Sequence, residues 1–333
     1  MIPRKNIVLV VGAGASHDFE PEMGTGQLLL ENILSRVNEV KETAYLTNIL
    51  DGLKEKFKIN ITPFQRKAFF EKLSEYQQSK SVRYSIDDFL NTNLGQDGFW
   101  EIGTSSIAFH VLGYEEACLR KASFSVNSWL EELNEFIIQH RLNTWNDRLI
   151  DLKIVTLNYD RLLEEFLYRK HGQAISEFIN KSIIHIYNKI SPLPWQQNEM
   201  KNNQGFLMFG HPNNDEQRIL DNKDNILLMF EQRMEKNLNL EPTKAAISSA
   251  NSILFLGYGY DTYNNKNLGL TKLNGKRIFA NYFIKEWNDK SKKEFEKFKA
   301  DNAIWGNQRD GITFTTETCT DFIRHWLRKV AEL

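Results

Sequence analysis

The apolar residues of this chain form short continuous runs and longer helical patterns, which alternate along much of the sequence. Residues 7–11 (Ile-Val-Leu-Val-Val) are apolar throughout and are followed directly by glycine. A run of this length and composition is typical of a buried parallel strand with both faces covered. Comparable runs predict further strands at residues 153–157, 182–187, 205–209, 252–256, 276–283 and 312–316.

The segments between these predicted strands show helical periodicity, and so does one long block of the sequence. Apolar residues recur at helical spacing over 26–40 and 161–170, and a shorter helix is predicted over 245–250. Within 42–149, amphipathic patterns such as 129–142 are frequent and strand-like runs are rare. This block is therefore expected to be helical.

Strands that alternate with helices predict an α/β protein with a parallel sheet. We expect a Rossmann-like open sheet with a helical insertion subdomain. Residues 1–41 and 150–333 would form the sheet domain, and residues 42–149 the insertion.

Composition and charge exclude several classes of protein. The 333 residues carry a formal net charge of -1, so no global basic field for nucleic acid exists, and direct nucleic-acid binding is not expected. Cys118 and Cys319 are too few for a four-cysteine zinc site and do not form a disulfide framework, so no metal site is expected. No apolar run is long enough for a membrane span, and we expect a cytoplasmic protein.

The turn after the first predicted strand is a candidate phosphate site. Gly12, Gly14 and Ser16 are small enough to let backbone amides approach a pyrophosphate at a strand-to-helix junction. The third glycine of the usual dinucleotide fingerprint is missing, and no acidic residue lies clearly about 20 positions further on. A tight turn without a ligand is the alternative interpretation.

Three later segments place polar side chains or glycines at strand ends. Residues 156–160 (Thr-Leu-Asn-Tyr-Asp) end a strand, where an amide can hold a ribose hydroxyl or a water, or can merely cap the next helix. His185 is a natural general base near neutral pH, although a strand histidine can also be a satisfied core residue. Residues 255–261 (Phe-Leu-Gly-Tyr-Gly-Tyr-Asp) form either a ligand-binding turn or an ordinary strand–loop junction.

In this order, the four segments resemble the sirtuin superfamily. Residues 12–16 are similar to its phosphate-binding opening, and residues 156–160 to its Thr-Gln-Asn-Ile-Asp signature, with Leu157 and Tyr159 substituted. The resemblance covers about residues 7–31 and 152–270.

Two further segments resemble the members of this superfamily that act in bacterial antiphage defence. Residues 184–187, followed by 192–195, look like the segment that carries the catalytic histidine. Residues 256–260, followed by Asn267 and Leu268, look like the last nucleotide-binding turn.

The resemblance implies an NAD⁺ glycohydrolase that converts NAD⁺ to nicotinamide and ADP-ribose without a metal. It assigns Asn158 and His185 as the catalytic pair. The histidine would act with the ribose, and the asparagine would position substrate or water at the anomeric carbon. The resemblance assigns the binding of NAD⁺ to Gly12, Ala13, Gly14, Ser16, Asp160, Gly257 and Tyr258.

The chain also departs from the deacetylating sirtuins. Residues 18–22 replace their Gly-Ile-Pro-Asp-Phe-Arg run and contain no matching arginine, and the zinc-binding cysteines are absent. Asn188 replaces the glycine that follows the catalytic histidine, and asparagine adopts positive φ less easily than glycine. The last departure concerns only the local backbone geometry, and the expected activity is hydrolysis of NAD⁺ rather than protein deacetylation.

Uncontrolled NAD⁺ hydrolysis would kill the cell, so the resemblance implies a gated effector of abortive infection. A separate sensor or ATPase is expected: a HerA-type translocase, a short Argonaute or a nucleotide-sensing protein. A homo-oligomer is expected too. The alternatives are an NAD-dependent ADP-ribosyltransferase or deacylase, and a non-catalytic module that senses NAD or ADP-ribose. His211, which precedes a proline and a polar loop, is the competing candidate for the histidine role of His185.

Overall fold

The computed structural model describes most of the sheet and of the helices around it. The described residues are 5–36, 40–79, 85–120, 127–140, 149–196, 206–210, 222, 225–226, 239–270, 273, 275–281, 292–293, 295–298 and 312–332.

Six parallel strands form one open sheet, as the apolar runs predict. They are β1 (Lys5–Val11), β2 (Ile150–Thr156), β3 (Ile183–His185), β4 (Ser252–Leu256), β5 (Arg277–Asn281) and β6 (Ile312–Thr315). Their order in the sheet is β3-β2-β1-β4-β5-β6. This is the order of the doubly wound Rossmann fold, so the predicted fold class is confirmed.

The chain reverses its direction of winding between β1 and β4. β1 pairs with β2 on one side and with β4 on the other, and all three strands end at the same edge. In open α/β sheets, ligands bind outside the carboxyl ends of the strands at such a switch point. A ligand-binding site is therefore expected at the turns that follow these three strands.

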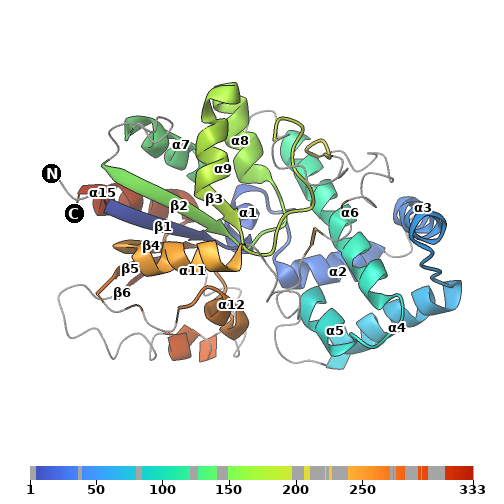
Figure 1. Cartoon of the computed structure of the whole chain (residues 1–333). Helices are drawn as coiled ribbons and strands as arrows, with labels where there is room; N and C mark the ends of the chain where they lie inside the picture. Colours follow the sequence, from blue (N-terminus) through green and yellow to red (C-terminus); the bar gives the residue numbers. More distant parts are fainter. Residues whose placement is uncertain are drawn as a thin grey trace.

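Helices cover both faces of this sheet. Figure 1 shows α8 and α9 on one side of it and α11 on the other. These surrounding helices are α7 (Trp129–Gln139), α8 (Leu162–His171), α9 (Ser176–Ser182), α11 (Leu240–Ser249), α12 (Thr262–Asn267), α14 (Cys319–Phe322) and α15 (Arg328–Glu332). A π-helical turn, η5 (Ile323–Leu327), joins the last two, and a 3₁₀ turn, η1 (Gly172–Ile175), joins α8 to α9.

A second group of helices lies beyond the carboxyl ends of the strands (Figure 1). It comprises α2 (Gly26–Arg36), α3 (Val40–Phe57), α4 (Pro63–Ser79), α5 (Ile86–Thr92) and α6 (Phe99–Arg120), and short α1 (Ala13–Phe19) leads into it. The long helix α6 contacts α2, α3, α4 and α5. α7 instead packs against α8, α14 and η5 beside the sheet. The division into two domains at residues 42–149 stays a prediction.

The side chains of β1 alternate between two apolar cores. Ile7, Leu9 and Val11 belong to a core shared with α7, α8 and α14, which continues into the helical group. Val8 and Val10 belong to a smaller core beneath α11. Each of these five side chains is at most 3% exposed, as expected for a strand covered on both faces. This double burial fixes the strand and therefore the position of the turn after it.

Two strand predictions need correction. Residues 206–209, the described part of the predicted strand at 205–209, form an irregular segment and a turn. Its carbonyl groups at Leu207 and Met208 accept hydrogen bonds from the Arg161 guanidinium and not from a neighbouring strand. The predicted strand at 182–187 is shortened to β3, because Ser182 ends α9 and the chain turns after His185.

Among the described residues, no helix combines the length and the apolar character needed to cross a membrane.

Candidate functional site

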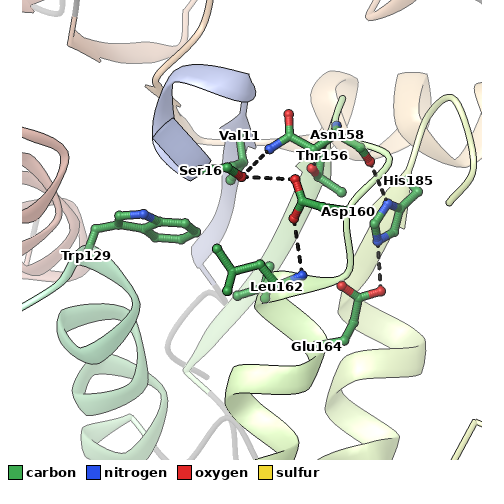
Figure 2. Close-up of a pocket in the computed structure, with 10 residues that line it drawn as sticks. Val11, Ser16, Trp129, Thr156, Asn158, Asp160, Leu162, Glu164 and His185 are labelled. Atoms are coloured by element: carbon green, nitrogen blue, oxygen red, sulfur yellow. Dashed lines mark hydrogen bonds and ion pairs between the residues drawn. The ribbon is translucent and has the colours of Figure 1, made fainter. Parts of the chain in front are cut away.

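A narrow cavity with an enclosed space of about 10 Å³ lies at the carboxyl ends of β1, β2 and β3. Its polar side chains come from α1, from the end of β2 and the turn after it, from α8 and from the end of β3, and they converge on one another (Figure 2). The lining residues are Val11, Ser16, Trp129, Thr156, Asn158, Asp160, Leu162, Leu163, Glu164 and His185. The structure therefore brings together four of the residues that the sequence assigns to the site: Ser16, Asn158, Asp160 and His185.

Asn158 lies at the centre of the switch point. Its Nδ2 donates hydrogen bonds to the Gly12 carbonyl oxygen at 3.3 Å and to Ser16 Oγ at 2.9 Å. The carbonyl acceptor identifies this end of the amide as the NH₂ group. The amide oxygen Oδ1 is buried and has no hydrogen-bond partner among the described residues. Asn158 is only 8% exposed, so this oxygen is an unused acceptor within the site.

Asp160 is tied into the same network. Ser16 Oγ donates to Asp160 Oδ2 at 3.1 Å, and the Leu162 amide donates to Asp160 Oδ1 at 3.1 Å. Burial raises the pKa of Asp160 from 3.8 to about 6, and the nearby Glu115 carboxylate adds to the rise. The two hydrogen bonds oppose the rise because they favour the ionised form. Asp160 therefore changes charge just below neutral pH.

His185 is buried, and both of its ring nitrogens have partners. Nδ1 lies 3.0 Å from the Asn158 backbone carbonyl oxygen, and Nε2 lies 2.8 Å from Glu164 Oε1 (Figure 2). The same Glu164 oxygen accepts a hydrogen bond from Lys189 Nζ at 3.2 Å. In this arrangement no ring nitrogen is left to take a proton from a substrate. His211, the competing candidate, lies outside the described residues.

Glu164 is a buried carboxylate in the first turn of α8. Burial alone would raise its pKa, but the electrostatic interactions with His185 and Lys189 and the hydrogen bond to His185 outweigh burial. They hold the pKa of Glu164 well below its usual range. Its second oxygen, Oε2, is buried without a partner among the described residues.

The glycines of the two turns pack backbone against backbone. The Gly12 amide donates to the Leu256 carbonyl at 2.9 Å, and the Gly14 amide donates to the Gly257 carbonyl at 3.0 Å. A Cβ atom at Gly12 would lie 2.5 Å from the Gly257 carbonyl oxygen, and one at Gly14 would lie 2.9 Å from it. The need for small residues at 12 and 14 is thus explained by this contact, and these two amides are used within the fold.

Gly257 offers a stability prediction with a matched control. Its φ is +59°, and an added Cβ would lie 2.0 Å from the Ala15 amide nitrogen. Gly275 also has a positive φ, +71°, but its added Cβ would meet nothing within 4 Å. Gly275→Ala is expected to lower the free energy of unfolding by about 1–2 kcal/mol, the cost of placing alanine at positive φ. Gly257→Ala must in addition displace α1 and is expected to cost distinctly more.

Urea denaturation of the two variants checks this prediction. Equal losses would show that α1 yields freely and that the glycine contact does not hold the two turns together.

The structure places the remaining assigned residues differently. Ala13 is the first residue of α1. Tyr258 is 3% exposed and packs into the core under α11, where its hydroxyl donates a hydrogen bond to Asn265 Oδ1 at 2.7 Å. Tyr258 therefore does not line the cavity. Asn188 has φ +59°, so asparagine does adopt here the left-handed conformation of the glycine it replaces. Asn239 Nδ2 holds it by donating to Asn188 Oδ1 at 2.8 Å.

Two residues of the site were missed in the sequence. Glu164 stands in the first turn of a predicted helix, where an acidic residue is ordinarily explained by the helix dipole. Trp129 reads as part of an apolar helix face, yet its indole Nε1 donates to the Ala15 carbonyl at 2.8 Å and anchors α1. Nothing in their local sequence distinguishes them from structural residues.

A fully buried ion pair supports the turn after β2. Arg161 and Glu115 on α6 are both 0% exposed, and the guanidinium donates to both carboxylate oxygens, at 3.0 and 2.6 Å. Arg161 Nη1 also donates to Ser191 Oγ and to the Leu207 carbonyl oxygen. Because Arg161 lies directly after Asp160, this pair connects the helical group to the site.

Comparison of the chain with models of known protein families found no match, and none of the curated proteins matches it either. Within the described ranges, no cluster of three or more His, Cys, Asp or Glu side chains is arranged to hold a metal ion.

Proposed function

We propose that this protein is an NAD⁺ glycohydrolase, which cleaves NAD⁺ to nicotinamide and ADP-ribose. The observation that carries the proposal is the free amide oxygen of Asn158, buried at the switch point of a Rossmann-like sheet. A ribose hydroxyl or an attacking water can donate a hydrogen to this oxygen, which has no other partner among the described residues. The resemblance of the four segments to the sirtuin superfamily, and of two of them to its members in antiphage defence, supports the same assignment.

The reaction requires little covalent chemistry from the protein. The bond between the ribose anomeric carbon and the nicotinamide nitrogen breaks, and its electron pair leaves with neutral nicotinamide. Water then adds to the oxocarbenium-like carbon and releases one proton. The ionised Asp160 carboxylate, buried beside Asn158, would stabilise the positive charge as it develops. Asn158 would hold the ribose or the water in line with the carbon that reacts.

Product analysis tests this function. Purified protein incubated with NAD⁺ should release nicotinamide and an equal amount of free ADP-ribose in the absence of any acceptor. Appearance of ADP-ribose on a protein, or of deacylated peptide only, would favour the transferase or deacylase alternative. Binding of NAD⁺ without turnover, alone and with every candidate partner, would favour a sensing module.

We further propose that the site is gated. The enclosed space of this cavity is about 10 Å³, room for roughly one water molecule. Pockets that hold drug-sized ligands measure roughly 300–1,000 Å³, and a dinucleotide is larger than most such ligands. The turns around Asn158 must therefore move apart for NAD⁺ to enter. The protein would be a homo-oligomeric cytoplasmic effector. A HerA-type translocase, a short Argonaute or a nucleotide-sensing protein would open its site, so that NAD⁺ is depleted only during infection.

Asp160 gives the proposed reaction a distinctive pH dependence. Since the pKa of Asp160 is raised to about 6, its carboxylate is protonated below that pH and ionised above it. Cleavage of NAD⁺ is expected to rise between pH 5 and pH 7 with a midpoint near 6, as the stabilising charge appears. Asp160→Asn should be slower and should lack this rise. A rate profile of the two proteins measures the difference, and the same rise in Asp160→Asn would exclude Asp160 as its source.

The same carboxyl affects stability in the opposite direction. The folded state binds the Asp160 proton more tightly than the unfolded chain, so stability is lost as pH rises through the interval from 3.8 to about 6. The full loss is ~3 kcal/mol. Relative to Asp160→Asn, the wild-type protein should therefore become less stable by most of that amount between pH 4 and pH 7.

A further inference from the structure

The surroundings of His185 restrict where its protons lie. One ring nitrogen faces the Asn158 carbonyl oxygen at 3.0 Å, and the other faces Glu164 Oε1 at 2.8 Å. A backbone carbonyl can only accept a hydrogen bond, so Nδ1 must be the donor in the first contact. The second contact is a donation from Nε2 if Glu164 is ionised.

Glu164 Oε1 also has a cationic neighbour, which favours the ionised form of the carboxyl group. Lys189 Nζ donates to it at 3.2 Å, and Lys189 is itself held by Gln196 Oε1 at 3.1 Å. An oxygen that already accepts from an ammonium is a poor place for a carboxyl proton. The charged groups that face His185 from the described elements are Glu164 on α8, Asp160 after β2 and, through Glu164, Lys189 after β3.

We infer that Glu164 and His185 form a buried ion pair that positions Asn158, with His185 acting as a double hydrogen-bond donor and not as a general base. The chain of contacts runs from Lys189 to Glu164, then to His185, then to the backbone carbonyl of Asn158. Holding this carbonyl fixes the peptide that carries the catalytic amide. Glu164 and His185 are thus positioning residues, and their kinetic role rests on the proposed function.

The pairing of β3 with β2 supports the positioning role of His185. His185 is the last residue of β3 and pairs with Thr156 of β2, two residues before Asn158. The Thr156 hydroxyl oxygen also accepts a hydrogen bond from the backbone N–H of Asn158 at 3.1 Å. Asn158 is therefore held from both strands, and loss of the histidine contact would free one side of its peptide.

Nitrogen NMR of the full chain labelled with ¹⁵N-histidine tests the ion pair without requiring activity. The chain has seven histidines, and His185→Gln identifies the signal of residue 185. In the wild-type protein at pH 7, both His185 nitrogens should carry protons and give two similar shifts. In Glu164→Gln the ring should be neutral, with one protonated nitrogen. A neutral ring in the wild-type protein would overturn the inference, even if Glu164→Gln does not fold.

Kinetics test the positioning role. Glu164→Gln is expected to lower kcat by about 10²-fold, the cost of a small misplacement of a catalytic group, with little change in KM. Glu165→Gln is the matched control: it changes the same group one residue along α8, where the partner is Arg169 at 2.7 Å. Full activity in Glu164→Gln would overturn the positioning role. If the wild-type protein does not cleave NAD⁺, the proposed function fails, while the NMR result still decides on the ion pair.

Discussion

Replacing Asn158 with alanine is expected to reduce NAD⁺ cleavage by on the order of 10²-fold or more, while the protein stays folded. The side chain contributes two hydrogen bonds to the turn after β1, and its free oxygen is the acceptor proposed for the substrate. Loss of the two bonds should cost about 2 kcal/mol of stability, which a sheet with two apolar cores tolerates. The loss of rate should therefore far exceed what partial unfolding explains.

Asn6 provides the matched control. Its Nδ2 also donates to a backbone carbonyl, that of Ser249 at 3.1 Å, but near the opposite end of β1. Asn6→Ala should lose a comparable bond and keep its rate of cleavage. Steady-state kinetics and thermal melts of both variants give the comparison. Near-normal turnover by a folded Asn158→Ala protein would remove Asn158 from the mechanism.

The second large effect is expected at the buried ion pair beneath the site. Arg161→Met leaves the Glu115 carboxylate buried without its cation and removes the donors to Ser191 and Leu207. Removing one partner of a buried pair typically costs 3–5 kcal/mol, because the remaining charge cannot reach water. Arg161→Met is therefore expected to lower the free energy of unfolding by ~4 kcal/mol in urea denaturation.

Arg169→Met is the control for this effect. Arg169 pairs with Glu165 at 2.7 Å, but its side chain is 47% exposed. An exposed pair of this kind is worth about 0.5 kcal/mol or less. Similar losses in the two variants would mean that Glu115 finds other partners or water once Arg161 is gone, and that the pair does not hold the helical group against the site.

Much of the fold could be predicted from the chain because its strands are buried on both faces. The run at residues 7–11 is apolar at every position, and the run at 252–256 is apolar at every position except Ser252; they form β1 and β4 with nearly the expected bounds. The run at 205–209 has a similar pattern, but its described residues, 206–209, pair with none of the six described strands. Its backbone is instead bound by Arg161, whose position beneath this segment depends on the whole fold.

The site was predictable only in part for the same reason. Ser16 follows β1, Asn158 and Asp160 follow β2, and His185 ends β3. Parallel strands bring their carboxyl ends to one edge. The partner of each side chain is set by packing across that edge. Glu164 gave no such signal because it lies within a helix, and its contact with His185 exists only once α8 has packed beside β3.

The glycines show how one pattern can arise from two causes. Gly12 and Gly14 match a phosphate-binding turn, but their closest neighbour is the backbone of Gly257. Binding of the NAD⁺ phosphates at this turn remains a prediction.

Proton NMR of NAD⁺ incubated with the purified chain, alone and with each candidate partner, tests the central claim most directly. We predict that signals of free nicotinamide and ADP-ribose grow in equal amounts, and that Asn158→Ala prevents their appearance. The contradictory result is NAD⁺ that stays intact under every condition, together with an affinity for NAD⁺, measured by calorimetry, that Asn158→Ala does not change.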